Sequence, residues 1–173
     1  VETCIALALS RKFEEILPNL DRIRYGNRAP SFSARRHFVS ADWIPGNEKI
    51  LRPMNLIADT VCEKEIDRVN FFRKKRKPFP RGLKLEPLEL ARLRYVSTGH
   101  FAEIVPKLPR ISVVLFVGGV SGTVVSHMGF AINDGGIVFR HASSRHRMVL
   151  DVDAMEYFST RPSLDGAAFL ELL

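Results

Sequence analysis

The sequence predicts an α+β domain, with helices in the first part of the chain and antiparallel strands in the last third. Near the start, apolar residues recur at helical spacing, whereas the last third carries short β-branched and aromatic runs separated by turn residues. This order is typical of helices packed on one antiparallel sheet. We expect a single domain over 1–173, with a helical and loop part over about 1–108 and a sheet part over about 109–173.

The first part is expected to contain two main helices. One is an apolar segment that ends near Arg11. The other spans 13–24 with a kink or a restart at Pro18, because proline lacks the backbone N–H that a helix interior needs. A long loop is expected at 25–38 and an extended or helical connector at 55–64. Two shorter helices are expected at 87–95 and 100–107.

The last third is predicted to be a meander of antiparallel strands. Its clearest signal is Asn133-Asp134-Gly135-Gly136, a strong hairpin turn between two apolar runs. Asp153 is suited to cap a short helix over 154–158, because its side chain can accept hydrogen bonds from free backbone N–H groups. The strands are expected at 111–117, 124–132, 137–142, 148–152 and 167–172.

Composition and charge limit the kinds of protein and of binding partner that fit this sequence. Of the 173 residues, 46% are hydrophobic. No apolar run reaches the roughly 18 residues of a membrane-spanning helix. The formal net charge of +7 suits a polyanion such as nucleic acid, anionic lipid or an acidic cell-wall polymer. The basic run Arg73–Lys77 is typical of a solvated face or mobile loop, and we expect no nucleic-acid partner. Paired CxxC and HExxH motifs are absent, so no metal or cofactor is expected.

Two histidines lie on neighbouring predicted strands. If the first strand alternates regularly, Val125, His127 and Gly129 share one face, with room for a ligand above the glycine. His141 lies on the next strand, and one register would bring the two imidazoles together. One imidazole could then act as a base while the other orients it, as nucleophilic hydrolases require. The alternative for His127 is a hydrogen-bonded histidine of the core.

The two cysteines are too few for a disulfide framework in a chain of this size. Cys4 lies in the first predicted helix. A thiolate near a helix N-terminus would be activated there, and the alternative is a small core residue. Cys62 has no histidine nearby in the sequence and indicates no chemistry. His100 and His146 show no partner pattern and are expected to be structural or exposed.

Three segments carry a resemblance to a known family. SHMGFAI (126–132), followed after a turn by VFRHASS (138–144), resembles the NlpC-like branch of papain-like cysteine peptidases. Upstream, the stretch from Arg35-x-His37-Phe38 to Ala41-Asp42-Trp43-Ile44 is similar to the NlpC-like N-acetylmuramoyl-L-alanine amidases, first catalogued as a domain of unknown function. The resemblance covers 1 to about 166.

The resemblance implies a cysteine amidase that hydrolyses the N-acetylmuramoyl–L-alanine amide bond of peptidoglycan fragments. His127 would accept the thiol proton, and His141 would fix its tautomer. Val1-Glu2-Thr3 is similar to the end of the family pattern D-C-V-T-F-V-E. We therefore expect an N-terminally incomplete domain whose nucleophile lies four positions before Val1, with Cys4 as the fallback nucleophile.

The resemblance also places Arg35 and His37 along the substrate groove. Arg35 could clamp a substrate carboxylate or brace a loop, and Trp43 could pack or line the pocket. Two other functions stay open: an inactive or repurposed module that binds a glycopeptide or anionic polymer, and a related thiol acyltransferase. A periplasmic or exported location follows from the resemblance alone, and it assigns no role to Arg73–Lys77.

Overall fold

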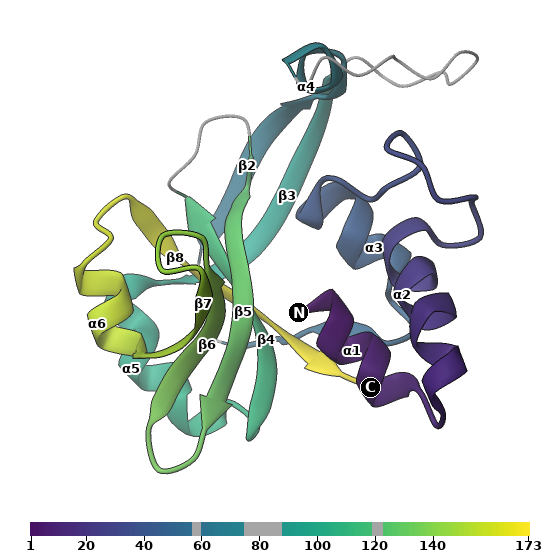
Figure 1. Cartoon of the computed structure of the whole chain (residues 1–173). Helices are drawn as coiled ribbons and strands as arrows, with labels where there is room; N and C mark the ends of the chain where they lie inside the picture. The colour runs from purple at the N-terminus through teal and green to yellow at the C-terminus, as the bar shows by residue number, and fades with distance from the viewer. Residues whose placement is uncertain (57–59, 75–87, 119–122) are drawn as a thin grey trace.

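The computed structural model describes residues 1–56, 60–74, 88–118 and 123–173. Its centre is an eight-stranded antiparallel sheet in the order β2-β3-β8-β4-β5-β6-β7, with β1 paired to β8 (Figure 1). The strands are β1 (Leu51–Pro53), β2 (Thr60–Asp67), β3 (Leu88–Ser97), β4 (Ile111–Gly118), β5 (Val125–Asn133), β6 (Ile137–Ser143), β7 (Met148–Asp153) and β8 (Leu164–Leu172). The predicted α+β class is confirmed.

Helices lie on both sides of this sheet. In Figure 1, α1, α2 and α3 lie on one side, and α5 and α6 lie on the other. The α-helices are α1 (Glu2–Leu9), α2 (Ile16–Tyr25), α3 (Ile44–Gly46), α4 (Arg68–Lys74), α5 (Phe101–Ile104) and α6 (Ala154–Ser159). Shorter helical turns are η1 (Phe13–Glu15), η2 (Val39–Trp43), η3 (Thr98–His100) and η4 (Val105–Lys107). Among the described residues, no helix is long and apolar enough to cross a membrane.

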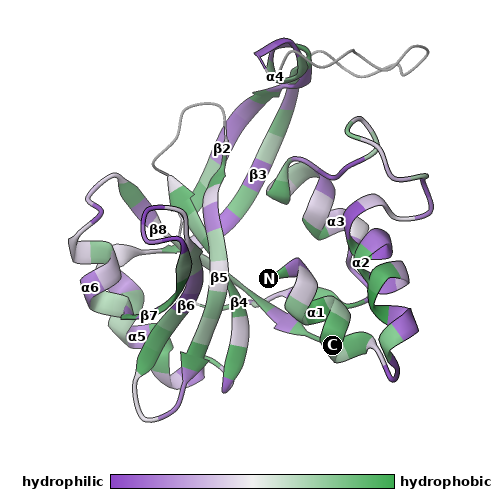
Figure 2. Cartoon of the chain, viewed as in Figure 1, coloured by the Kyte–Doolittle hydropathy of each residue, from purple (hydrophilic) through white to green (hydrophobic). Residues whose placement is uncertain are grey.

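The central strand β4 is buried on both faces, which explains its continuous apolar sequence. Val113 and Leu115 join one core with Ile5 of α1. Val114 and Phe116 point the other way and join a second core with α5 and α6. Figure 2 shows hydrophobic residues along the central strands and α1, while loops and α2 carry much of the hydrophilic surface.

Several predicted elements are confirmed. The strands β4 to β7 pair in sequence order as a meander. The turn before β6 has Gly135 at φ +79, a backbone conformation that glycine adopts without strain. Asp153 caps α6, since its Oδ1 accepts from the backbone N–H groups of Met155 at 2.9 Å and Glu156 at 3.0 Å. The second predicted helix is found as η1 followed by α2, but the change occurs at Ile16 and not at Pro18, which is tolerated in the first turn of α2.

The helix expected at 87–95 is wrong, because Leu88–Ser97 forms strand β3. Ala91 and Leu93 are buried whereas Arg92 and Arg94 are exposed, which is the period of two that a strand requires. β3 pairs along its length with β2, and part of it also with β8. The region before 109 was expected to hold only helices, loops and a connector, but it contributes β1, β2 and β3 to the sheet.

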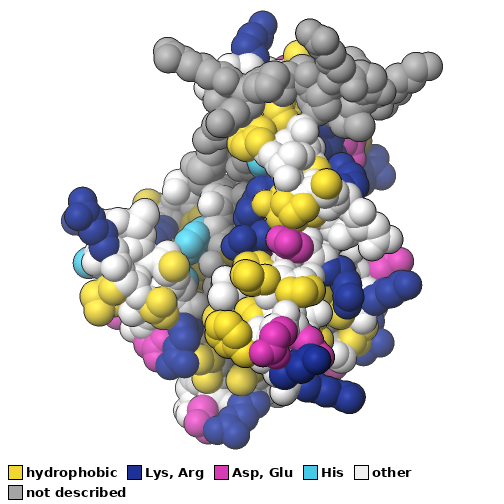
Figure 3. All heavy atoms as spheres, turned by 45° about the vertical axis from the view of Figure 1, so that its right-hand side comes forward, with side chains coloured by type: hydrophobic (Ala, Val, Ile, Leu, Met, Phe, Trp, Pro, Cys, Tyr) yellow, Lys and Arg dark blue, Asp and Glu magenta, His cyan; other side chains and the backbone are white. Residues whose placement is uncertain are grey.

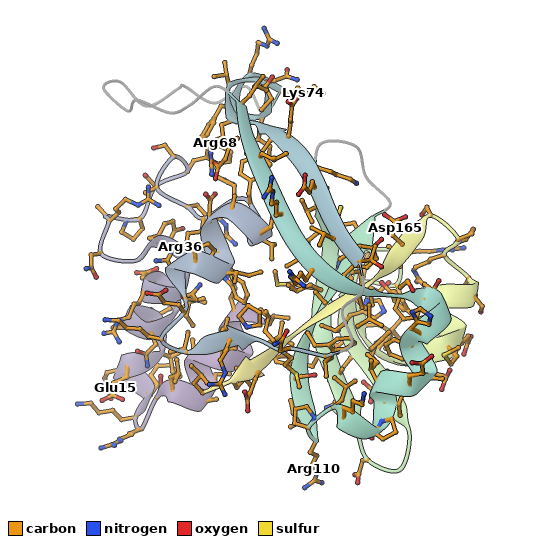
Figure 4. All side chains as sticks on the ribbon, turned by 180° about the vertical axis from the view of Figure 1, so that it is seen from behind. Glu15, Arg36, Arg68, Lys74, Arg110 and Asp165 are labelled. Carbon is orange, nitrogen blue, oxygen red and sulfur yellow. The ribbon has the colours of Figure 1, made fainter. Side chains whose placement is uncertain are left out.

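The strands β2 and β3 form an arm that carries α4 at its far end (Figure 1). Arg68 at the base of α4 binds Asp42 through two hydrogen bonds of 2.6 and 3.0 Å, and it binds Glu89 at 2.6 and 3.0 Å (Figure 4). The largely buried pair with Asp42 ties the arm to η2, and the pair with Glu89 fixes the start of α4 on β3. Of the basic run 73–77, only Arg73 and Lys74 lie in the described part of the chain.

Candidate functional site

His127 on β5 and His141 on β6 form a hydrogen-bonded pair. The Nε2 atom of His127 lies 3.1 Å from Nδ1 of His141. The rings are perpendicular, with centroids 5.1 Å apart. His127 is half-buried and His141 is buried. In the described part of the chain, Nδ1 of His127 has no hydrogen-bond partner, and it is not among the buried unpartnered atoms. That nitrogen is therefore free to exchange a proton with another group.

A β-bulge turns His127 toward this position. The β4–β5 ladder pairs Phe116 with His127 but Val117 with Val125, so Ser126 is the extra residue. The Ser126 hydroxyl donates to the Phe116 carbonyl at 3.2 Å. Val125 consequently packs against the α1 side of the sheet, and the expected shared face of Val125, His127 and Gly129 is wrong at Val125. Bulges commonly re-aim one side chain near a functional site.

The two histidines do not lie directly opposite each other. The β5–β6 ladder ends with Phe130 paired to Arg140, so one further step places Gly129 opposite His141. A Cβ atom at position 129 would lie 2.7 Å from the Arg140 carbonyl oxygen and 3.1 Å from Cβ of His141. Strand β6 therefore fills the space expected for a ligand above Gly129. The missing side chain lets the two strands approach closely enough for the imidazoles to meet.

Aromatic rings support the pair from the side of α6. Phe116 stacks on His127 with centroids 5.9 Å apart, and it stacks on Tyr157 at 4.4 Å. Tyr157 in turn stands edge-on to His141 at 5.1 Å. Arg161 lies over the Tyr157 ring, with its guanidinium carbon 3.8 Å from the centroid. Tyr157 and Arg161 were not predicted from the sequence, although Tyr157 lies on the helix expected over 154–158.

Both histidines are held toward the neutral form. Burial is the main cause that lowers the pKa of His127, with further contributions from His141 and Arg161. Burial also lowers the pKa of His141, again with a contribution from Arg161. A neutral imidazole at neutral pH can accept a proton, which a general base must do.

A cavity of about 280 Å³ opens at the amino end of α1. Val1 and Met128 line it together, so the start of α1 lies against β5 at the residue that follows His127. Three guanidinium groups and one carboxylate also line the cavity, from Arg24, Arg35, Arg36 and Glu2. In Figure 3, Lys and Arg side chains gather beside the hollow between the helices and the sheet, with a histidine across from them. The excess positive charge suits an anionic ligand.

Glu2 holds two of these arginines. Its Oε2 atom accepts from Nε of Arg24 and Nη2 of Arg35, each at 2.9 Å. The Arg35 side chain is 36% exposed, so it braces the loop and still faces solvent. Arg36 is held differently, since its Nη1 donates to the Arg22 and Ile23 carbonyl groups at the end of α2. Of the two arginines that Glu2 holds, Arg35 is the more exposed.

His37 and Trp43 line the same cavity but have structural contacts as well. Nε2 of His37 bonds the Phe32 carbonyl oxygen at 2.6 Å, and its ring lies among Phe32, Phe71 and Phe72. Burial in this cluster lowers the pKa of His37. Trp43 is only 1% exposed, and its indole nitrogen has no partner in the described residues. Both side chains shape the wall of the cavity.

The two cysteines lie away from the histidine pair. Cys4 is exposed and lines an apolar groove of about 300 Å³ with residues such as Phe130 and Ile132, and neither histidine lines that groove. Cys62 lies on β2 opposite Leu93. His146 is exposed in the β6–β7 turn and contacts the Ser143 hydroxyl at 2.9 Å. Among the described residues, no group of three or more His, Cys, Asp or Glu side chains is arranged to hold a metal.

Comparison with known proteins gives one family and several similar structures. A family model described as AmiA-like, N-acetylmuramoyl-L-alanine amidase-like, matches residues 1–166. A search of curated proteins gave no match. An N-acetylmuramoyl-L-alanine amidase from Bacteroides uniformis superposes with a TM-score of 0.75 at 19% identity, over 99% of this chain and 80% of that chain.

Two further structures share the fold. A protein from Legionella pneumophila has a TM-score of 0.82 at 23% identity and covers 99% of this chain and 73% of its own. A Bacteroides fragilis protein described as a candidate xylanase has a TM-score of 0.77 at 22% identity, with 98% and 83% coverage. At these identities the likeness is one of fold.

Proposed function

The chain belongs to the AmiA-like family of N-acetylmuramoyl-L-alanine amidase-like proteins, and we propose that it is a cysteine-dependent amidase. Its substrate is a peptidoglycan fragment, and the bond that it hydrolyses joins N-acetylmuramic acid to L-alanine. The observation that carries the proposal is the His127–His141 pair: Nδ1 of His127 has no partner among the described residues, and the next residue in β5, Met128, lines a cavity with Val1 at the amino end of α1. A thiol at the start of a helix facing a histidine on an antiparallel sheet is the papain-like arrangement.

The nucleophile in this proposal is a cysteine four positions before Val1. Continuing α1 by four residues toward its amino end advances the chain by about 6 Å and turns it through about 400°, so the new side chain points nearly as Val1 does. Val1 lines the cavity with Met128, the neighbour of His127 in β5. The amino end of a helix also lowers a thiol pKa. This position therefore suits a thiolate that faces Nδ1 of His127.

The proposed reaction runs through a thioester. His127 carries its proton on Nε2, which donates to Nδ1 of His141, so Nδ1 of His127 accepts the thiol proton. The thiolate attacks the lactyl carbonyl carbon, and backbone N–H groups at the helix start stabilise the oxyanion. Nδ1–H of His127 then protonates the L-alanine nitrogen as the C–N bond breaks. Water, deprotonated by His127, attacks the thioester, and the C–S bond breaks to restore the thiol.

The cationic cavity supports a substrate that carries carboxylates, as stem peptides do. Arg35 has one nitrogen on Glu2, and its other donors have no side-chain partner among the described residues, so a carboxylate could engage them. Glu2 stays paired with Arg24 when Arg35 is engaged elsewhere. His37 and Trp43 would support the loop that presents Arg35 and shape the groove around the peptide.

The direct test uses the natural chain with the residues that precede Val1. We expect an N-acetylmuramoyl-L-alanyl peptide to be split into free sugar and free peptide, which mass spectrometry resolves. Replacing the upstream cysteine by alanine should abolish both products, because no other group forms the thioester. Cys4→Ala is the matched control and should leave turnover unchanged, since Cys4 lines a groove that contains neither histidine.

Other results would point to other functions. If Cys4→Ala removes turnover and the upstream replacement does not, the fallback nucleophile is correct. A protein without any upstream cysteine that binds muropeptides but releases no product would be an inactive binding module. Transfer of the acyl group to an added amine in preference to water would indicate a thiol acyltransferase.

Replacing Arg35 by methionine is expected to raise KM for a carboxylate-bearing muropeptide about 10-fold and to change kcat little, because one charged hydrogen bond to bound substrate is lost. Steady-state kinetics on the natural chain measure both constants. Arg52→Met is the control, since Arg52 pairs with Glu171 on the exposed β1–β8 edge. An unchanged KM in the Arg35 variant would leave Arg35 with its loop-bracing role only.

A further inference from the structure

Arg161 lies on the α6 side of the histidine pair, in the turn between α6 and β8. Its guanidinium carbon is 3.8 Å from the centroid of the Tyr157 ring. That ring stands edge-on to His141 at 5.1 Å, and His141 bonds His127. A continuous series of contacts therefore connects one cation to the candidate base. None of the residues in this series lines the arginine-rich cavity at the start of α1, so this is a second cationic group beside the pair.

The charge of Arg161 has no counter-ion in the described part of the chain. Arg161 forms none of the ion pairs found there, and only its Nη1 atom is engaged, with the Tyr157 carbonyl at 3.1 Å and the Thr160 hydroxyl at 3.0 Å. Other arginines of the protein, such as Arg68 and Arg140, are paired with carboxylates at 2.6 Å. If Arg161 only capped the end of α6, an acidic partner would not disturb that role, so capping alone does not explain the missing counter-ion.

We propose that Arg161 is a positioning residue of the histidine pair: its guanidinium group holds the Tyr157 ring against His141 and keeps an unneutralised positive charge beside both imidazoles. The stacking restricts the ring that His141 packs on, which fixes the direction of the His141–His127 hydrogen bond. The charge disfavours a proton on either histidine, so the base stays free below the usual titration range of histidine. The part of this inference that concerns turnover rests on the proposed amidase function.

The other charged or titratable groups that face the pair have different effects. His146 adds positive charge at His141. Tyr157 is neutral at physiological pH, because burial raises the pKa of its hydroxyl. Arg161 is the group that contributes at both histidines. Removing its charge should therefore move the two titrations together.

The test is an NMR titration of the histidine ring protons in three proteins. In Arg161→Met, which keeps an apolar chain over Tyr157, the pKa values of His127 and His141 should both rise by about 0.5. In Arg161→Lys, which keeps the charge, both should stay near those of the parent protein. His37 serves as an internal reference, since its surroundings are Phe32, Phe71 and Phe72.

The variant Thr160→Val distinguishes a purely structural role of Arg161 from an electrostatic one. This change removes hydroxyl contacts to Glu156, Tyr157 and Arg161 at the end of α6 but leaves the charge in place. We expect it to lower the melting temperature and to leave both histidine titrations unmoved. If Arg161→Met behaves in the same way, Arg161 only caps α6 and the proposal is overturned.

Turnover gives a second readout. In the natural chain, the acid limb of kcat/KM should move to higher pH in Arg161→Met and return in Arg161→Lys. A shift of the histidine titrations in a protein without turnover would sustain the electrostatic role and refute the amidase. Normal turnover with an unmoved acid limb and unmoved histidine titrations would support the amidase and refute the electrostatic role of Arg161.

Discussion

Replacing His127 by alanine is expected to lower turnover of an N-acetylmuramoyl-L-alanyl peptide by about 10³-fold or more, because one group serves as base, then acid, then base again. Its Nε2 is held by His141 at 3.1 Å, and in the described residues its Nδ1 has no other partner. Among the described residues, the rings packed on the pair are those of Phe116 and Tyr157, and burial raises the pKa of the Tyr157 hydroxyl, so neither would act as a base at neutral pH. Single-turnover kinetics on the natural chain measure thioester formation directly.

The same substitution removes a structural contact, so its effect on folding needs a control. Without His127, the buried Nδ1 of His141 has no partner, a loss that costs about 1–3 kcal/mol. A thermal melt of the variant shows whether the fold survives at the assay temperature. His146→Ala is the matched control, because His146 lies in an exposed turn and, in the described part of the chain, hydrogen-bonds Ser143 alone. Turnover of the His127 variant within about tenfold of the parent would mean that the base lies elsewhere.

The sheet could be predicted in its second half but not in its first. The meander from β4 to β7 has apolar runs separated by turn residues, and Asp153 has the residue type that caps a helix. Strand β3 has alternating burial, but the segment LELARLR also places leucines at spacings that a helix allows. The pairing partner of β3 is β2, whose strand residues are mostly charged or polar, so local pattern favoured the wrong element.

The sequence predicted that the two histidines could meet, but it did not predict the geometry of their contact. The two imidazoles were expected from strand order and a short turn, which are local properties. Ser126 forms a bulge because of how β5 pairs with β4, and a single sequence does not encode that register visibly. Tyr157 and Arg161 were missed because they reach the pair from α6 and from the turn after it, whose packing depends on the whole second core. The cavity charges at Glu2 and Arg24 were missed because they meet only when α1 packs on α2.

Replacing Gly129 by alanine is expected to separate the two histidines without altering either of them. The new Cβ would lie 2.7 Å from the Arg140 carbonyl oxygen, and the backbone of β6 must move to relieve that contact. We expect a loss of about 1–3 kcal/mol in the free energy of unfolding, which is typical of overpacking. Since a 1 Å misplacement can reduce catalysis about 10²-fold, turnover should fall by that order even where the protein is fully folded.

Gly136→Ala is the matched control for this change. It adds the same methyl group in the β5–β6 turn, where no heavy atom would lie within 4 Å of the new Cβ. Gly136 also lacks the positive φ of its neighbour Gly135, so the control adds no backbone strain. Denaturant unfolding and the His127–His141 hydrogen-bond signal in NMR distinguish the two variants. If Gly129→Ala weakens the fold but leaves that signal and turnover intact, the close approach of β5 and β6 stabilises the sheet but does not determine the geometry of the histidine pair. If turnover falls while the control is unaffected, the absence of a side chain at 129 belongs to the catalytic geometry as directly as the two imidazoles do.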